Sequence, residues 1–417
     1  MNNGGRTLNL FQRTPFVILA MAGDFLQLAR AQNEPKPLFT EQGPTISQRS
    51  LTAEGCSLIS ADVFNARLHQ PLGELLMIRL QRFSAGAALA LALSVAAGAA
   101  QAQTVFRING WLPPTHPIMT RTLKPWADEV AAATQGRVRF EVTASTLGPP
   151  PTQIDMVKDG IVEAVFSVHG YTPQRFTLAR VGELPFLSDL SEPLSVALWR
   201  VTEKHFAARD EHAGMQLLAL WAAQPGRVWT SKKPLKTMAD WNGIKLAGGA
   251  AINVDIAKAL GGVGIRAPGP QAAEMVRRGV TDGLFIDASS FTDFSLQGTI
   301  RHMLDFPKGM YSATFFFGVN KARWNQLSQA DRDAILKLSG ERLSAIAGRN
   351  WDAEAAKSRE NVKAAGVEVT MASGAYLAEL ENALRSFEED WLKAAQGAGV
   401  DSKAALADLK SIINSYK

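Results

Sequence analysis

Apolar and polar positions along the chain follow two periods, which alternate between strand and helix. Strict alternation predicts strands, and apolar positions three and four residues apart predict helices. In a first block, predicted strands cover residues 104–111, 137–143, 162–168 and 216–222. The predicted helices of this block cover residues 123–131, 152–159 and 193–209.

The same alternation resumes in a second block. Its predicted strands cover residues 243–247, 263–266, 282–286 and 311–319, and its predicted helices cover 252–260 and 271–278. A helical pattern then runs from 328 to about 365, before a strand over 367–371 and helices over 376–396 and 403–415. Two such blocks predict two α/β domains with largely parallel sheets. Because no linker separates the blocks, we expect several chain crossings between the domains.

Residues 77–102 have the three parts of a secretory signal peptide in the right order. Arg79 and Arg82 are the positive region, residues 85–98 are uncharged and apolar, and cleavage is expected after Ala102. The alternative is a membrane anchor, but the uncharged stretch from 84 to 100 has only 17 residues, against about 20 for a span. We therefore expect an exported, periplasmic protein that does not span the membrane after cleavage.

A signal peptide belongs at an N-terminus, and this one starts at Met77. We interpret residues 1–76 as a misannotated upstream extension, and the alternative is a genuine leader. The only cysteine, Cys56, lies in this segment. Without residues 1–102 the chain has 36 basic and 33 acidic residues, a net charge of +3. No basic run exceeds a pair, so a nucleic-acid partner is not expected.

Short catalytic and metal-binding motifs are absent from the sequence. The five histidines after residue 102 do not have H-E-x-x-H spacing, and no cysteine accompanies them. The chain has no phosphate-binding G-x-x-x-x-G-K-[ST] loop and no G-x-S-x-G nucleophile elbow. An exported α/β protein of this kind is more typical of a binding protein than of an enzyme, and no cofactor is expected.

Six segments in order resemble one family over nearly all of residues 103–417. They read WLPPTHPIMTRTLKPWADEVAAATQGRVRFEV, TLGPPPTQIDMVKDGIVEAVF, GYTPQRFTLARVGELPFL, KKPLKTMADWNGIKL, IAKALGGVGIRAPGPQAAEMVRRGVTDG and YSATFFFGVNKARWNQLSQADRDAI. The chain is similar in these segments to the solute-binding proteins of tripartite ATP-independent periplasmic (TRAP) transporters. The resemblance implies a two-lobed periplasmic binding protein fold, with crossing strands, a long hinge helix and a ligand cleft between the lobes.

The resemblance also implies lobe boundaries. Lobe I would comprise 103–224 plus 313–352, and lobe II would comprise 225–312 plus 353–383. The C-terminal helices over 384–417 would cross back over lobe I. A small organic solute would bind in the cleft and be delivered to a TRAP membrane permease. Because members of the family usually bind organic acids, the resemblance implies an organic acid here. The alternatives are a ligand-presenting sensory receptor on the same fold, or an exported enzyme that uses His116, His169 and Asp287.

Members of this family usually hold the ligand carboxylate with an arginine, because a guanidinium donates two parallel hydrogen bonds. That position is Ala247 here, which makes the chain an atypical member. A second family arginine corresponds to Arg227, which we expect to be the anion anchor. The ligand could then be an organic acid, or a less charged, hydroxylated or aromatic solute.

Ligands in open α/β sheets bind beyond the carboxyl ends of the strands. The loops after the predicted strands therefore supply the other candidate ligand-binding residues. These are Trp111 and His116 after the first strand, His169 and Tyr171 after the third, and Asp287 and Phe291 after the strand that ends at 286. Phe315, Phe316 and Phe317 lie in a continuous apolar run, which predicts a strand buried on both faces.

Overall fold

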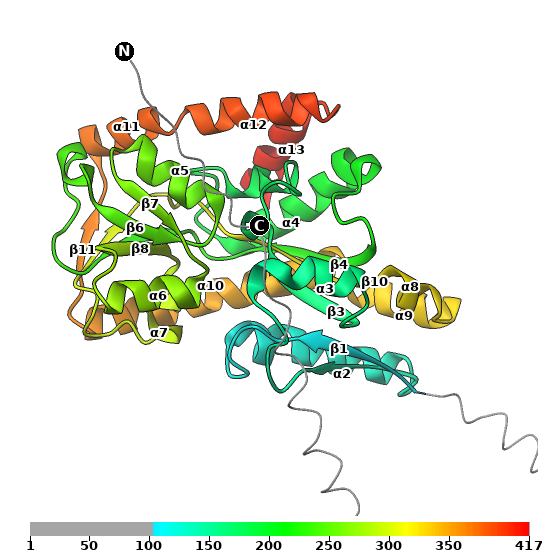
Figure 1. The fold of residues 1–417 in the computed structure, drawn as a ribbon. Helices are drawn as coiled ribbons and strands as arrows, with labels where there is room; N and C mark the ends of the chain where they lie inside the picture. Colours follow the sequence, from blue (N-terminus) through cyan, green and yellow to red (C-terminus); the bar gives the residue numbers. More distant parts are fainter. Residues whose placement is uncertain (1–102, 417) are drawn as a thin grey trace, which may run out of the picture. The chain divides into compact units, whose positions relative to one another are not determined.

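The computed structural model describes residues 103–416, so the predictions for the signal peptide, the upstream extension and Cys56 lie outside the described residues. The described chain forms two β-sheets, each covered by helices (Figure 1). The first sheet has the strand order β2-β1-β3-β10-β4, and the second sheet has the order β11-β9-β5-β8-β6-β7. This mixed architecture of helices and sheets confirms the predicted α/β class.

The first sheet consists of β1 (Thr104–Asn109), β2 (Val138–Val142), β3 (Ala164–Val168), β4 (Met215–Ala222) and β10 (Thr314–Asn320). The second sheet consists of β5 (Arg227–Thr230), β6 (Lys245–Gly248), β7 (Val263–Arg266), β8 (Gly283–Ile286), β9 (His302–Asp305) and β11 (Glu368–Met371).

Each sheet contains one strand that runs against its neighbours. In the first sheet β10 is antiparallel to β3 and β4, and in the second sheet β5 is antiparallel to β8 and β9. The prediction of largely parallel sheets is wrong at these two strands. Each of them directly follows a crossing from the other sheet, so no helical crossover within the sheet sets its direction. The apolar pattern reports burial of a strand and not its direction.

Both faces of the first sheet are buried. Phe317 belongs to the apolar cluster on one face, with Trp126 and Phe140, and its neighbour Phe316 belongs to the cluster on the other face. This explains the continuous apolar run in β10, since successive side chains point to opposite faces. The helices associated with this sheet are α2 (Lys124–Ala133), α3 (Gln153–Lys158), α4 (Ser191–Val201), α8 (Lys321–Asn325) and α9 (Gln329–Leu338).

The second sheet is buried in the same way. Val228 and Trp229 of β5 belong to two different apolar clusters, one on each face of the sheet. The covering helices α5 (Ala251–Ala259), α6 (Gly269–Arg277) and α7 (Ala288–Asp293) follow β6, β7 and β8 respectively. All three helices therefore begin at the carboxyl ends of neighbouring strands, at one edge of the sheet.

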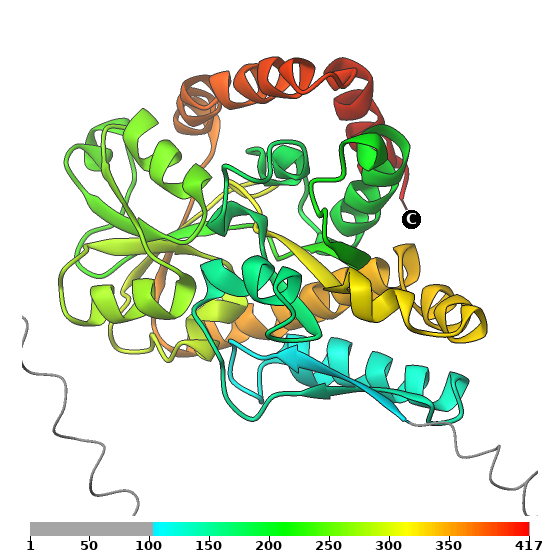
Figure 2. The same cartoon turned by 45° about the vertical axis from the view of Figure 1, so that its right-hand side comes forward.

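The long helix α10 (Glu341–Ala364) links the two sheets. It contacts β4 and α4 of the first sheet and α7 of the second (Figure 2). The helical pattern over 328–365 predicted one helix, but the structure divides it into α9 and α10 at Ser339–Gly340.

The C-terminal helices contact both parts of the molecule. They are α11 (Gly374–Ala383), α12 (Ser386–Gly397) and α13 (Ser402–Ser415), where a single helix over 376–396 and one over 403–415 were predicted. Leu380 of α11 belongs to an apolar cluster of the second sheet, whereas Trp391 and Leu409 belong to one of the first.

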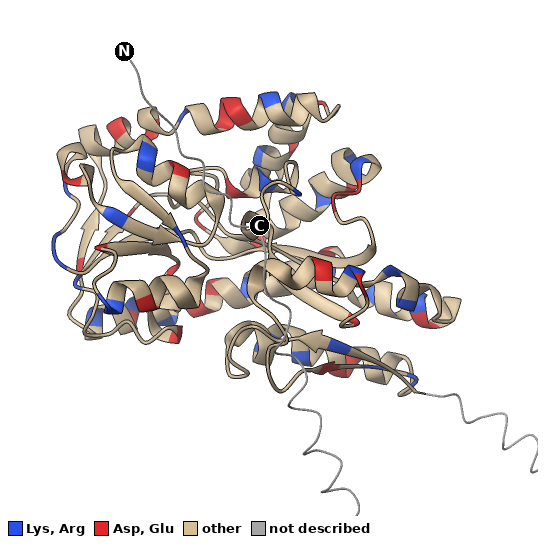
Figure 3. Ribbon diagram, in the orientation of Figure 1, with Lys and Arg blue, Asp and Glu red and all other residues tan. Residues whose placement is uncertain are grey.

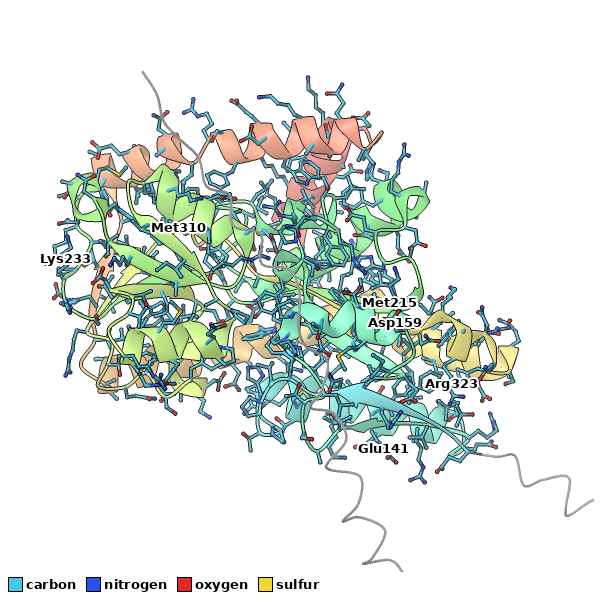
Figure 4. The ribbon with its side chains drawn as sticks, in the orientation of Figure 1. Glu141, Asp159, Met215, Lys233, Met310 and Arg323 are labelled. Carbon is cyan, nitrogen blue, oxygen red and sulfur yellow. The ribbon has the colours of Figure 1, made fainter. Side chains whose placement is uncertain are left out.

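Figure 4 shows Met310 and Lys233 on the side of the second sheet and Met215 on the side of the first.

Charged residues of both signs are scattered over the helices (Figure 3). Within residues 103–416, no helix combines the length and the apolar character needed to cross a membrane.

Candidate functional site

A cavity lies where the carboxyl ends of strands from both sheets meet. The loops after β1 and β3 supply one wall, and the loops after β6, β7 and β8 supply the opposite wall. The cavity contains about 660 Å³ of space not filled by atoms, including its opening to solvent. A concave site beyond the carboxyl ends of strands is a common place for a small ligand to bind.

Aromatic side chains form a third of the residues that line the cavity. Seven aromatic residues line it, namely Trp111, Tyr171, Phe285, Phe294, Tyr311, Phe315 and Trp351. The Trp111 indole is fixed, because its Nε1 donates to the Phe166 carbonyl oxygen at 2.9 Å and its ring stacks on Phe166 at 5.4 Å. Phe315 stacks on the buried Trp221, with ring centroids 5.6 Å apart. The wall is therefore rigid and suited to a flat apolar ring.

The Tyr171 ring lies directly against the backbone of Gly249 on the opposite wall. A Cβ atom at Gly249 would lie 2.7 Å from Tyr171 Cε1, so only glycine allows this approach. Burial raises the pKa of Tyr171 to about 12 and the pKa of Tyr311 well above 10. Both phenols therefore keep their protons at neutral pH and can donate hydrogen bonds.

Arg266 joins the two walls at the rim of this contact. It lies at the end of β7, and its Nη2 donates to the carbonyl oxygens of Gly170 at 2.9 Å and Tyr171 at 2.6 Å. These acceptors follow β3, so one guanidinium of the second sheet holds a loop of the first.

Asp287 is the acidic residue of the cavity lining, and its carboxylate caps helix α7. Oδ1 accepts from the backbone amides of Ser289 and Ser290 at 3.0 and 3.1 Å, and Oδ2 accepts from the Ser290 hydroxyl at 2.7 Å. This arrangement satisfies the first amides of the helix. The Asp287 carboxylate is therefore already engaged in hydrogen bonds that hold the loop after β8.

His116 lines the same cavity and faces an acid of the second sheet. Its Nδ1 accepts from the Ile118 amide at 3.2 Å, so the proton of the neutral ring lies on Nε2, which is 3.4 Å from Asp293 Oδ2. Burial lowers the pKa of His116 to about 4. Burial, with the charges of Asp287 and Glu354, raises the pKa of Asp293 to about 7. At neutral pH His116 is an uncharged donor.

Two further polar residues line the cavity, each with an atom that has no hydrogen-bond partner. Gln224 is 1% exposed, and its Nε2 donates to the Trp351 carbonyl oxygen at 2.8 Å while its Oε1 has no partner. Asn253 is 2% exposed, and its Nδ2 has no partner. The indole Nε1 of Trp351 is likewise unpartnered. Buried polar atoms are rarely left so, and in a cavity such atoms are candidates for ligand contacts.

The structure brings four of the seven expected ligand-binding residues together in this cavity: Trp111, His116, Tyr171 and Asp287. Arg227 does not line it, because its Nε pairs with Asp305 Oδ1 at 2.7 Å and its Nη1 donates to the Pro225 oxygen. Ala247, at the other arginine position, is buried in an apolar cluster of the second sheet. Of the described residues that line the cavity, none is a lysine or an arginine.

His169 and Phe291 also lie outside the cavity lining. His169 is buried beneath the first sheet, where Nδ1 lies 3.0 Å from the Thr314 hydroxyl and Nε2 lies 3.0 Å from His212 Nε2. Phe291 is buried against Trp229, with ring centroids 5.2 Å apart. The three residues of the alternative hypothesis, an exported enzyme, therefore do not lie together: His169 is in the core, and His116 and Asp287 are at the cavity.

Sequence reasoning missed Asn253, Gln224, Tyr311 and Trp351. Asn253 lies in the first turn of a helix, where an asparagine is usually a capping residue. Gln224 and Tyr311 lie on the crossings between the sheets, and Trp351 lies inside α10, so no strand-end pattern pointed to them. Over residues 103–416, no group of three histidine, cysteine or acidic side chains is placed to hold a metal ion.

Comparison with known proteins gives a consistent match. The family model described as "Bacterial extracellular solute-binding protein, family 7" matches residues 108–394. A curated relative from Comamonas testosteroni, described as "Outer membrane transporter protein TsaT", is 32% identical over 314 residues, which are 74% of this chain and 91% of the relative.

Two solved structures are similar to this chain over their whole length. One is a TRAP periplasmic solute-binding protein from Bordetella bronchiseptica with bound (R)- and (S)-mandelate, which is 36% identical with a TM-score of 0.74. It covers 75% of this chain and 100% of its own. The other, from an unidentified marine microbe, is described as specific for aromatic acid ligands and contains 3-hydroxybenzoate. It is 30% identical, covers 76% of this chain and 99% of its own, and has a TM-score of 0.71.

Proposed function

We propose that this chain, which belongs to the bacterial extracellular solute-binding proteins of family 7, binds an aromatic carboxylic acid in the cavity between its two sheets. The chain is a solute-binding protein of the TRAP type, which captures a small organic solute for a membrane permease. The family consists of binding proteins, and we propose that this member releases its ligand chemically unchanged.

The aromatic lining of the cavity is the observation that carries the ligand class. Trp111, Tyr171, Tyr311, Phe315 and Trp351 offer ring faces and edges to a small planar ligand. Relatives that bind mandelate and 3-hydroxybenzoate support the same class. The neutral donors at the cavity supply hydrogen bonds for an acid group.

We propose that binding closes two lobes around a hinge. Lobe I is residues 103–224 plus 313–352, lobe II is 225–312 plus 353–383, and 384–417 form the C-terminal helices. The two crossings between the sheets and helix α10 support this division. The permease would recognise the closed form, and an ion gradient across the membrane would drive transport.

A thermal-shift screen tests the ligand class. Benzoate, mandelate and 3-hydroxybenzoate should each raise the melting temperature of the purified protein by several degrees, because a ligand at 100 times its Kd adds about 2.7 kcal/mol to stability. Succinate and glucuronate, which have no aromatic ring to stack, should not. Stabilisation by the aliphatic acids alone would contradict the proposal.

We also propose that the chain is exported to the periplasm and cleaved after Ala102. N-terminal sequencing of the protein recovered from the periplasm should begin at Gln103. Any other mature N-terminus would show that the cleavage site is misplaced.

A further inference from the structure

Three helices begin at the cavity, and each N-terminus is a potential site for a ligand carboxylate. The starts of α5, α6 and α7 contribute Gly249 and Ala250, Gly269, and Asp287 to the lining. A helix N-terminus favours an anion, because its first amides have no partner in the helix and its dipole is positive there. The question is which of the three is free to accept a ligand.

The N-termini of α6 and α7 are already engaged. The Asp287 carboxylate accepts from the first amides of α7, so that end already holds an anion. In α6 the second residue is Pro270, which has no amide proton, and the Tyr171 hydroxyl lies beside the Gly269 amide. Helix α5, with nine residues and no proline, remains.

Asn253, in the first turn of α5, lines the cavity, and only one of its two polar side-chain atoms has a hydrogen-bond partner among the described residues. Its Oδ1 accepts from the Ala250 amide at 3.0 Å and so fixes the side chain. The other end of the amide, Nδ2, has no hydrogen-bond partner although the residue is 2% exposed. The Tyr311 hydroxyl lies near enough for Asn253 to oppose the rise in its pKa. A fixed, buried donor therefore lies at the N-terminus of α5, beside the Tyr311 hydroxyl and with no partner at hydrogen-bond distance among residues 103–416.

The backbone before α5 is shaped to admit this side chain and a ligand. A Cβ atom at Gly248 would lie 2.3 Å from Asn253 Cβ and 2.9 Å from Oδ1, so the folded-back position of Asn253 requires glycine there. The Tyr171 ring lies against the backbone of Gly249, which has no side chain to keep it away. The two glycines thus allow Asn253 and the Tyr171 ring to lie close against the backbone before α5.

We infer that the carboxylate of the bound aromatic acid lies at the N-terminus of α5, where it accepts hydrogen bonds from Asn253 Nδ2 and the first free amides of the helix. This subsite takes the place of the guanidinium that the sequence lacks at Ala247. The inference rests on the proposed function, because it locates one group of the ligand proposed there.

Neutral donors make this subsite different from an arginine clamp. The donors at the cavity are amides, phenols and the uncharged His116, while Asp287 adds a negative charge to the same wall. A second negative charge at the subsite would therefore repel a carboxylate with no cation in the cavity lining to compensate. The ligand's ring, by contrast, would contact only the aromatic wall.

The substitution Asn253→Asp tests the subsite with little change in shape. Aspartate keeps the oxygen that accepts from Ala250, so the helix cap is preserved, but it replaces the donor with a charged acceptor. Affinities for benzoate and for benzamide are measured by calorimetry in the wild type and the variant. Asn382→Asp, at an exposed position on α11, is the matched control for the change in net charge.

The substitution should weaken benzoate binding at least 50-fold and leave benzamide binding unchanged or stronger, because the amide group of benzamide can donate to the carboxylate that the substitution introduces. Asn382→Asp should bind both as the wild type does. Equal benzoate affinity in the Asn253→Asp variant and the wild type would overturn the inference and leave the proposed function standing. Failure of the wild type to bind any aromatic acid would overturn both.

A second measurement needs no folded variant. In a ¹⁵N-labelled wild-type protein, saturating benzoate should shift the side-chain amide signal of Asn253 more than that of any other asparagine. An unshifted Asn253 signal in the presence of bound benzoate would also overturn the inference.

Discussion

Arg266 Nη2 lies 2.6 Å from the Tyr171 carbonyl oxygen and donates a hydrogen bond to it across the rim of the cavity. Arg266 belongs to the second sheet and Tyr171 follows a strand of the first, so the bond exists only when the two walls are close. The same guanidinium also binds the Gly170 oxygen. The pair therefore holds the two walls of the cavity together.

Removing this bond should shift the protein towards an open arrangement. We expect Arg266→Ala to weaken benzoate binding about tenfold, at the low end of the range of about 1.5–3 kcal/mol for hydrogen bonds to charged groups, because Arg266 is exposed to solvent. Calorimetric titration measures the change. Arg278→Ala, which removes a guanidinium paired with Glu274 near the end of α6, should bind benzoate as the wild type does. Equal affinities in the two variants would show that the Arg266 bond does not favour closure.

The contact between Gly249 and Tyr171 should tolerate no side chain. A methyl group at Gly249 would come within 2.7 Å of the ring and displace it from the cavity wall. We expect Gly249→Ala to lower the affinity for benzoate by tenfold or more, measured by the change in tryptophan fluorescence on binding. Gly397→Ala in α12, where nothing lies within 4 Å, is the control and should leave affinity unchanged. Wild-type affinity in Gly249→Ala would contradict the assigned wall.

Gln224 and Trp351 offer an acceptor and a donor that could share one ligand hydroxyl. Gln224 Oε1 and Trp351 Nε1 are both unpartnered, and the two residues are joined by the bond from Gln224 Nε2. We expect the wild type to bind 3-hydroxybenzoate about three- to tenfold more tightly than benzoate.

Trp351→Phe removes the donor and keeps most of the ring. The ratio of the affinity for 3-hydroxybenzoate to that for benzoate should therefore fall towards one. Competition of the two acids in one calorimetric experiment gives the ratio. The buried Trp324 of α8 lies outside the cavity lining, and Trp324→Phe should preserve the preference. A preference that survives Trp351→Phe would place the hydroxyl elsewhere.

Glu183 should make stability depend on pH. Burial is the main cause that raises its pKa from 4.5 to about 7, against the opposing effect of Arg180. The folded state then binds a proton that the unfolded state has lost, so this residue favours folding at low pH and its contribution falls as pH rises from 4.5 to 7. The loss is about 3 kcal/mol for a shift of this size.

Glu183→Gln cannot lose that proton. The stability of the variant minus that of the wild type, measured by denaturant unfolding, should therefore increase between pH 4.5 and 7. The difference between the two proteins is used because a second residue also makes stability depend on pH. Burial lowers the pKa of His212 to about 3, so the stability of both proteins rises with pH up to about 6.5, and this shared change cancels in the difference. The same change at exposed Glu360 controls for the loss of one carboxyl group. A difference that does not vary with pH would contradict the assignment.

Much of the fold could be predicted because burial leaves a periodic pattern. The strand over 263–266 was predicted with its observed bounds, and the apolar run of β10 was recognised as buried on both faces. Strands β5 and β9 were not predicted, although each is as long as the strand over 263–266. The reversed direction of β5 and β10 is set by the crossings between the sheets, which no local pattern records.

The site could be predicted only where position in the fold decides it. The rule that ligands lie beyond strand ends led to Trp111 and Tyr171, which line the cavity. It also led to His169, but that ring turns inward to Thr314 and His212. Arg227 was expected to bind the ligand because it corresponds to a family arginine, but its guanidinium pairs with Asp305, which is 78 residues away in sequence. Such long-range partners are visible only in three dimensions.

The central claim is that this protein binds an aromatic carboxylic acid in the cavity between its sheets. A calorimetric titration of the wild type with benzoate and with cyclohexanecarboxylate tests it most directly, because the two acids differ in the aromatic character of the ring and share the carboxylate. We predict one benzoate bound per chain, at least tenfold more tightly than the saturated acid. No binding of benzoate, or equal affinity for the two acids, would contradict the account.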